Sequence, residues 1–185
     1  MVMINKLIAL LIIIILSPVV FFVFFLIFIE DGFPIFFTQK RVGVNYTFFQ
    51  IYKFRSMKKN TPNVATHLLV NPEQYLLKIG RILRKLSLDE LPNLINIIKG
   101  EMVFVGPRPA LYNQDDLMEL RVKAGVDKLK PGITGWAQIN GRDEISIEQK
   151  VALEAEYLKR KSFLFDCKII LLTFSNVILR KGVKH

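Results

Sequence analysis

The feature that most constrains this chain is an apolar run from Leu7 to Ile29, in which 23 consecutive residues carry no charge. A helix of that length can cross the hydrocarbon core of a bilayer, which is about 30 Å thick. The run is longer than the apolar region of a signal peptide, and the residues at its end, Phe-Leu-Ile-Phe-Ile-Glu, offer no small-residue cleavage site. The sequence therefore predicts a retained N-terminal membrane anchor.

Ser17 and Pro18 lie at the middle of this apolar run. Proline removes a backbone hydrogen bond and clashes with the carbonyl four residues earlier, so we expect a kink. The Ser17 hydroxyl can satisfy a freed backbone group in lipid. Positive charge stands on both flanks, with Lys6 before the run and Lys40 and Arg41 after it. Both flanks therefore look cytoplasmic, which mildly favours a re-entrant helix, but these residues leave a spanning helix open as well.

Outside the anchor the chain is strongly basic, with 25 Lys and Arg against 16 Asp and Glu and a net charge of +9. Such a charge indicates an anionic partner. Because the chain also carries a membrane segment, we expect a phospholipid bilayer or phosphorylated substrates. Nucleic acid is not expected, because the basic residues interleave with aliphatic ones and no recognition module is visible.

The metal-binding side chains exclude several kinds of site. Cys167 is the only cysteine, so an intrachain disulfide is excluded. Because His67 and His185 are far apart in the sequence, a zinc cluster is excluded too. A metal in this chain would be a hard cation on oxygen ligands, with Mg²⁺ as the first candidate.

The rest of the chain is typical of a compact, mostly helical α/β domain with few short strands. Extended segments are expected at 39–43, 47–54 and 102–105, and helices at 75–86, 91–98, 115–122, 147–161 and 163–179. The first of these helices is basic and amphipathic, which fits core packing and membrane contact equally well. The last is strongly apolar but interrupted, which predicts a helix in the plane of the membrane interface.

Two adjacent carboxylates stand in the string Ser87-Leu-Asp89-Glu90-Leu-Pro92. With Asp89 as the N-cap, Pro92 falls at the third helical position, where its missing N–H costs little. Ser87 and Glu90 also fit a capping box, but that register places Pro92 deeper in the helix and is less favourable. Both carboxylates would then lie in the first turn of a helix. Acidic residues at such places are often only caps, so the string by itself allows a capping role and a catalytic one.

Two further strings add cationic groups. In Val105-Gly-Pro-Arg108-Pro, each proline restricts the residue before it, so Arg108 is held extended and suits bidentate contact with a phosphate. The segment 131–142, Pro-Gly-Ile-Thr-Gly-Trp-Ala-Gln-Ile-Asn-Gly-Arg, gathers three glycines and ends at Arg142. Glycine-rich loops let backbone N–H groups approach phosphates, although a purely structural turn explains the glycines equally well.

Together with Lys53-Phe-Arg-Ser-Met, these strings resemble the motifs of the monotopic phosphoglycosyl transferases, also called bacterial sugar transferases. The resemblance runs in order along nearly the whole chain, through Ser17-Pro18 and on to Tyr157, Ser162 and Asp166. It is to the minimal members of the family, which lack additional N-terminal spans. No departure occurs at the motif positions.

The resemblance implies an architecture. Residues 1–30 would form a re-entrant membrane helix broken at Ser17-Pro18, and residues 31–185 a catalytic domain with interfacial amphipathic helices. This domain would lie on the cytoplasmic face of the bacterial inner membrane.

The resemblance also implies a reaction. Asp89 would attack a UDP-sugar and release UMP, Glu90 would bind Mg²⁺, and polyprenyl (undecaprenyl) phosphate would accept the phospho-sugar. Arg108 is the first candidate for phosphate binding, followed by Lys53, Arg84 and Arg142. An N-acetylated amino sugar is the expected donor sugar, although no residue pattern specifies it.

Two other functions remain to be weighed. A membrane-associated glycosyltransferase would release UDP and could use Asp115 and Asp116 as a metal pair, although a helix cap explains that pair more simply. A non-catalytic basic membrane scaffold would leave Asp89 and Glu90 without a purpose. Polytopic phosphoglycosyl transferases are excluded as relatives by the single long apolar run.

Overall fold

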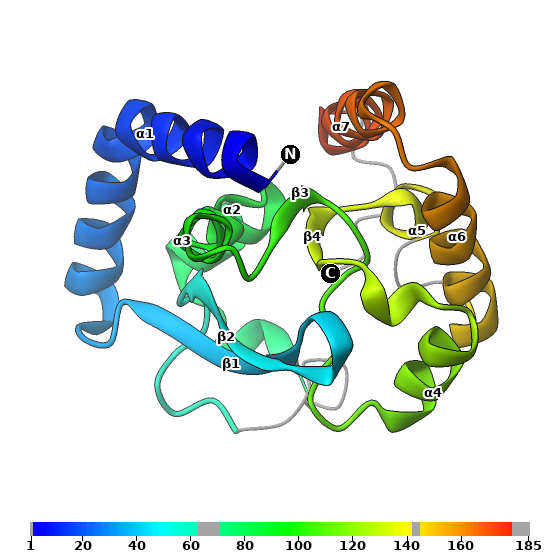
Figure 1. Cartoon of the computed structure of the whole chain (residues 1–185). Coiled ribbons are helices and arrows are strands. Elements are labelled where there is room, and N and C mark those ends of the chain that lie inside the picture. Colours follow the sequence, from blue (N-terminus) through cyan, green and yellow to red (C-terminus); the bar gives the residue numbers. More distant parts are fainter. Residues whose placement is uncertain (1, 63–70, 142–144, 179–185) are drawn as a thin grey trace.

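The computed structural model describes residues 2–62, 71–141 and 145–178. Its helices and strands are α1 (Val2–Asp31), β1 (Phe36–Val42), β2 (Phe48–Phe54), α2 (Lys78–Lys85), α3 (Asn93–Lys99), β3 (Val103–Val105), α4 (Asp115–Lys123), β4 (Gly132–Thr134), α5 (Trp136–Ile139), α6 (Ile147–Arg160) and α7 (Phe163–Ile178). The prediction of a mostly helical chain with few short strands is therefore confirmed (Figure 1).

Helix α1 is long and sharply bent (Figure 1). Pro18 lies inside it, and the Ser17 Oγ donates a hydrogen bond of 2.8 Å to the carbonyl of Ile14. That carbonyl is the one whose helical partner is lost at Pro18, so the hydroxyl satisfies the group that the proline frees. In the described part of the chain, α1 is the one helix long and apolar enough to cross a membrane.

Both arms of the bent α1 pack against the same globular body. Ala9, in the first arm, is buried in a cluster with residues of β2 and α3, including Ile51 and Ile97. Val23 and Ile27, in the second arm, are buried in another cluster, formed by Ile35, Phe54, Leu77 and Leu83. Most other side chains of α1 are exposed although they are Leu, Ile, Val and Phe. This apolar surface has no protein cover, as expected for a helix surrounded by lipid.

Strands β1 and β2 form an antiparallel hairpin in which Phe36 pairs with Phe54 and Val42 with Phe48. Asn96 of α3 is fully buried and fixes this hairpin. Its Oδ1 accepts from the backbone N–H of Tyr52 at 3.2 Å, and its Nδ2 donates to the carbonyl of Gln50 at 2.7 Å. These bonds hold α3 against β2, so the residues just before α3 are placed beside the strand that carries Lys53.

Strands β3 and β4 are parallel and bring the two glycine-containing motifs together. Gly106 donates its N–H to the carbonyl of Thr134 at 2.8 Å, and Gly132 donates to the carbonyl of Pro107 at 2.9 Å. A Cβ atom on Gly132 would lie 2.2 Å from the backbone nitrogen of Gly106. These glycines are therefore required for close backbone packing, and the structural explanation of them is the one supported here.

Helix α2 begins at Lys78 rather than at residue 75, because a 3-10 turn over Pro72–Tyr75 and a bridge between Met57 and Leu76 occupy the preceding residues. Its buried residues, Gly80 and Leu83, face the protein core. Core packing is thus established for this helix.

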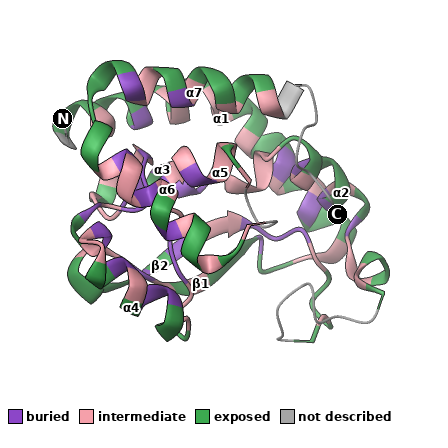
Figure 2. Cartoon of the chain, turned by 90° about the vertical axis from the view of Figure 1, so that its right-hand side faces the viewer, coloured by how far each residue is buried: buried purple, intermediate pink, exposed green. Residues whose placement is uncertain are grey.

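Helices α4 and α6 pack together, and α7, which follows α6 directly, packs against β3 and β4. Figures 1 and 2 both place α7 and the first arm of α1 at the same edge of the molecule. Phe165 and Ile169 of α7 are buried, whereas its apolar side chains on other faces are exposed, among them Phe163, Leu171 and Phe174. One face of α7 thus packs on the protein and the rest leaves apolar surface uncovered.

Candidate active site

The Asp89-Glu90 pair lies in a 3-10 turn over Leu88–Glu90, between α2 and α3. The prediction that Asp89 caps the next helix is wrong. Ser87 adopts a left-handed conformation (φ 55°) and its carbonyl accepts the N–H of Glu90, which closes a separate turn. Pro92 then precedes α3 directly, as its N-cap, where its missing N–H costs nothing. Asp89 and Glu90, the acidic dyad, therefore lie, partly buried, in a separate 3-10 turn and not in the helix α3.

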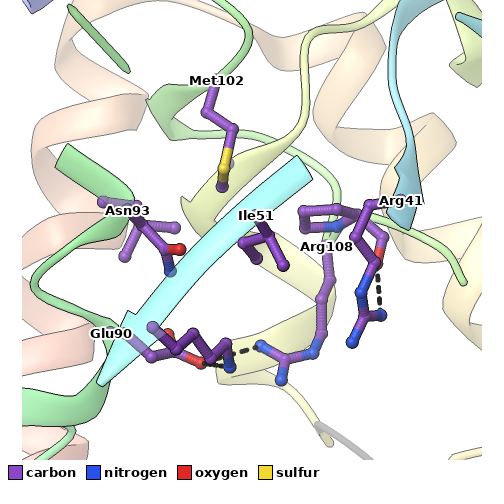
Figure 3. Close-up of a pocket in the computed structure, with 10 residues that line it drawn as sticks. Arg41, Ile51, Glu90, Asn93, Met102 and Arg108 are labelled. Carbon is purple, nitrogen blue, oxygen red and sulfur yellow. Dashed lines mark hydrogen bonds and ion pairs between the residues drawn. The ribbon is translucent and has the colours of Figure 1, made fainter. Parts of the chain in front are cut away.

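A cavity opens beside this turn (Figure 3). The residues that line it come from β1, β2, the dyad turn, α3 and the two glycine-containing motifs: Arg41, Ile51, Lys53, Glu90, Asn93, Met102, Arg108, Pro109, Gly132 and Ile133. Three residues predicted from the sequence, Lys53, Glu90 and Arg108, are brought together here although they are far apart along the chain.

Glu90 lies at the centre of a charge cluster. Lys53 Nζ donates to Glu90 Oε1 at 2.6 Å, and Arg108 Nη1 lies 3.7 Å from the same oxygen. The side chains of Lys53 and Glu90 are each 17% exposed, so the cluster is largely shielded from water. Charges held in such a place interact more strongly than on the open surface.

Asp89 is half-buried and does not line the cavity itself. Burial raises the pKa of its carboxyl above the ordinary value, the negative charge of Glu90 raises it further, and the positive charges of Lys53 and Arg84 oppose both effects. Arg84, on α2, also donates its Nε to the Ser56 hydroxyl at 2.9 Å. The structure thus places Arg84 near Asp89, whereas Arg142 lies outside the described residues.

Arg41 and Asn93 also line the cavity, and sequence reasoning missed both. Asn93 is 2% exposed, and its buried Oδ1 has no hydrogen-bond partner among the residues that the structure describes. The available signal for Arg41 was a charged residue within a short extended segment, and for Asn93 it was an amide three residues after Glu90. Neither signal is specific without knowledge of which strand and helix meet.

A buried ion pair holds the backbone of Arg108 in place. Arg121 of α4 binds both carboxylate oxygens of Glu154 on α6, and these two side chains are only 6% and 2% exposed. Arg121 Nη2 also donates to the backbone carbonyl of Arg108 at 2.9 Å. In the sequence these two residues are charged at positions where helical spacing would place apolar ones, and that pattern is the signal for a buried ion pair.

The other chemically suggestive residues have structural positions. Tyr157 OH lies 2.8 Å from Asp166 Oδ1 and 3.1 Å from the carbonyl of Val105, so it joins α6, α7 and β3. Asp115 and Asp116 are exposed in the first turn of α4 and do not line the cavity. Gln114 is the N-cap of this helix, so the expectation that the pair forms the cap is wrong, although Asp116 Oδ1 accepts the N–H of Leu117 at 2.8 Å within the first turn.

Few oxygen ligands for a hard cation lie near the Asp89-Glu90 pair. In residues 2–62, 71–141 and 145–178 no group of three or more His, Cys, Asp or Glu gathers as a metal cluster. Glu90 and Asn93 nevertheless line one cavity, and both side chains carry oxygen ligands of the kind that Mg²⁺ takes. Because Mg²⁺ usually fills its remaining positions with water and substrate phosphates, this donor set fits the ion.

Comparison with known proteins agrees with this arrangement. The sequence model of the bacterial sugar transferase family matches residues 2–180. The uncharacterized sugar transferase EpsL of Bacillus subtilis is 41% identical, and the match covers 91% of this chain and 82% of that protein.

Two longer relatives have more specific names. The UDP-glucose:undecaprenyl-phosphate glucose-1-phosphate transferase of Escherichia coli is 37% identical over 94% of this chain and 39% of its own length. The undecaprenyl-phosphate galactose phosphotransferase of Salmonella typhimurium is 35% identical over the same shares of the two chains. The resemblance seen in the motifs is thereby confirmed, and the chain belongs to the bacterial sugar transferase family of enzymes.

Proposed function

We propose that this enzyme transfers a phospho-sugar from a UDP-sugar to polyprenyl phosphate, undecaprenyl phosphate in bacteria, and releases UMP. The observation that carries the proposal is the acidic dyad, which is held in a tight turn among Lys53, Arg84 and Arg108. Cations placed around a carboxylate nucleophile suit a polyanionic substrate. The names of the Escherichia coli and Salmonella relatives describe reactions of the same kind.

In the first displacement, an oxygen of the Asp89 carboxylate attacks the phosphorus that bears the sugar. The new O–P bond forms while the phosphoanhydride bond breaks, and UMP leaves with the bridging oxygen and its electron pair. The carboxylate must be ionised for this step. The raised pKa of Asp89 makes it a better nucleophile than an ordinary carboxylate once it has lost its proton.

A carboxylate that approaches a diphosphate meets repulsion of several kcal/mol, on the order given by Coulomb's law at low dielectric. Lys53 and Arg108 lie where they can offset it, because both already face Glu90. Mg²⁺ held by Glu90, with Asn93 in the same cavity, would neutralise diphosphate charge and stabilise the leaving UMP.

In the second displacement, an oxygen of polyprenyl phosphate attacks the phosphorus now esterified to Asp89. The bond from that phosphorus to the aspartyl oxygen breaks, Asp89 regains its carboxylate, and the sugar leaves as a polyprenyl diphosphate. The two displacements are separate in time, so ping-pong kinetics are expected.

The nucleotide product tests the proposal. We expect UMP, and no UDP, when purified enzyme receives Mg²⁺ and a matching UDP-sugar from a panel that includes glucose, galactose and N-acetylated amino sugars. Without acceptor, UMP should appear as a burst of one equivalent per enzyme at most, with the phospho-sugar on Asp89 detected by peptide mass. UDP as the product would instead support the glycosyltransferase, and no nucleotide product with any donor would support the scaffold.

Removal of the metal should abolish the burst. A chelator is expected to stop UMP release, and Glu90→Gln should raise the Mg²⁺ concentration needed for half-maximal rate by about 10-fold or more, because a charged ligand is lost. Glu119→Gln, at an exposed position on α4, is the matched control and should behave like the wild type. An unchanged Mg²⁺ requirement in Glu90→Gln would remove Glu90 from the metal site.

We also propose that α1 is re-entrant, with the catalytic domain on the cytoplasmic face of the inner membrane and α7 in the interface. Two observations support this: both arms of α1 pack on one domain, and Lys6 lies against Gly100 at the end of α3. A straight helix through the bilayer would carry its two ends to opposite sides.

Cysteine labelling tests this topology. In a Cys167→Ser background, Met3→Cys and Thr38→Cys should both react with an impermeant thiol reagent from the cytoplasmic side only. Adding Pro18→Leu restores the broken hydrogen bond and should move the Met3→Cys site out of reach, whereas the neighbouring Val19→Leu should not. If Met3→Cys reacts from the periplasmic side in the protein that keeps Pro18, the re-entrant topology is wrong.

A further inference from the structure

Arg41 occupies a fixed position at one end of the cavity, near the end of β1. Its Nη1 donates to the carbonyl of Pro109 at 3.0 Å and its Nη2 to Gln39 Oε1 at 2.6 Å. The backbone of β1 is fixed to the same segment, since Arg41 bridges with Leu111. Arg41 and Arg108 are therefore placed side by side by the pairing of β1 with the residues that follow Arg108.

The third nitrogen of this guanidinium has no partner among the described residues. Arg41 Nε is buried and makes no hydrogen bond with any described residue. No carboxylate in the described part of the chain forms an ion pair with Arg41 either. A buried donor left without an acceptor costs free energy, so such a group in a cavity indicates a missing acceptor.

The neighbours of Arg41 make an anion the fitting acceptor. Figure 3 shows the guanidinium groups of Arg41 and Arg108 next to each other, with Glu90 on the far side of Arg108. Burial lowers the pKa of Arg41 to about 10, the charge of Arg108 lowers it too, and Glu90 only partly compensates. Because Glu90 offsets the repulsion between these two like charges only in part, a phosphate between them would supply the counter-charge that is still missing.

We propose that Arg41 and Arg108 form a phosphate subsite on the side of the reacting phosphorus opposite Asp89. The subsite holds the phosphate of the group that leaves in the first displacement or attacks in the second. This inference rests on the proposed function. In an in-line displacement at phosphorus, the entering and leaving oxygens lie on opposite sides. The UMP phosphate expelled by Asp89 and the polyprenyl phosphate that later attacks must therefore use the same side, one after the other. One phosphate subsite suffices for both, and the two half-reactions distinguish which phosphate uses it.

The variants Arg41→Gln and Arg41→Lys test the subsite, with Arg81→Gln as the matched control because Arg81 is an exposed residue of α2 that pairs with Glu73. Three quantities are measured on the full chain in detergent with Mg²⁺: the inhibition constant of UMP, the KM of the UDP-sugar in the burst, and the KM of polyprenyl phosphate when the labelled enzyme is chased. Arg41→Gln should weaken the binding of at least one phosphate-bearing ligand by about 10- to 100-fold, the loss expected when a charge-assisted hydrogen bond is removed. Arg41→Lys should recover part of it, and Arg81→Gln should lose nothing.

The pattern of losses assigns the ligand. If UMP and the UDP-sugar both bind more weakly, the subsite holds the nucleotide phosphate. If only the KM of polyprenyl phosphate in the chase rises, the subsite holds the lipid phosphate. If the nucleotide ligands and the lipid phosphate all bind more weakly, it holds each phosphate in turn. Wild-type values for all three ligands in a folded Arg41→Gln protein would overturn the proposal. If that variant melts below the assay temperature, Arg41→Lys decides, because it keeps the charge but loses the fork of donors. Absence of UMP release by the wild type would instead reject the reaction and not the subsite.

Discussion

Asp89→Asn is expected to lower phospho-sugar transfer by on the order of 10³-fold or more, because an amide cannot form the ester with phosphorus. The donor-only burst of UMP should disappear together with the mass shift of the Asp89 peptide. Asp115→Asn, at an exposed position in the first turn of α4, provides the matched control and should keep the wild-type burst. A full burst in Asp89→Asn would end the proposal of a covalent intermediate.

The same substitution should not weaken the fold at neutral pH. Burial raises the pKa of Asp89 above its ordinary value of 3.8, so the folded protein holds the ionised carboxylate less favourably than the unfolded chain does. Removing that charge should raise the melting temperature at pH 7. The gain should shrink as the pH falls through the raised pKa and vanish below the ordinary one, where the carboxyl is protonated in both states. A melting temperature that falls at pH 7 would mean that Asp89 is a structural residue.

Breaking the buried pair behind Arg108 should have the largest effect on stability. Glu154→Leu would leave the guanidinium of Arg121 buried without its carboxylate, and a loss of about 3–5 kcal/mol in the free energy of unfolding is expected. Denaturant unfolding in detergent measures it. Because Arg121 also holds the carbonyl of Arg108, the activity that remains should show a raised KM for the UDP-sugar.

The double variant Arg121→Met/Glu154→Leu separates charge from packing. Removing both charges leaves no unpaired ion, so the double variant should be markedly more stable than Glu154→Leu alone. Glu156→Leu is the matched control on the same helix, since Glu156 is partly exposed and pairs with Arg160 on the surface. Additive losses in the double variant would show that the pair contributes no coupling.

Local pattern was enough to predict most elements of the fold. The extended segments at 39–43, 47–54 and 102–105 and the helices at 91–98, 115–122, 147–161 and 163–179 were expected from periodicity and apolar runs. The pairing of β1 with β2, the strand β4 and the short helix α5 were not expected. The kink at Pro18 and the use of the Ser17 hydroxyl were expected as well, because both depend on groups within four residues of each other. Residues 179–185 and Arg142 lie outside the described part, so the expectations for them stay predictions.

The site was predicted only in part, for a physical reason. Lys53, Glu90 and Arg108 belong to recognisable strings, so their meeting in one cavity was expected. Arg41 reaches the cavity through a contact with Pro109, 68 residues along the chain, and no local pattern reports such a contact. The turn of the dyad was misjudged because Ser87 takes a left-handed conformation that its sequence does not reveal.

The bend in α1 limits how far each of its two arms can reach into a bilayer. Residues 2–17 and 18–31 form arms of about 24 and 21 Å at 1.5 Å per helical residue, and the hydrocarbon core is about 30 Å thick. Neither arm alone reaches the opposite headgroups. In the proposed topology and reaction, a lipid loaded at this site would therefore stay in the leaflet where the nucleotide sugar is available, and its passage to the outer surface would require a separate transport protein.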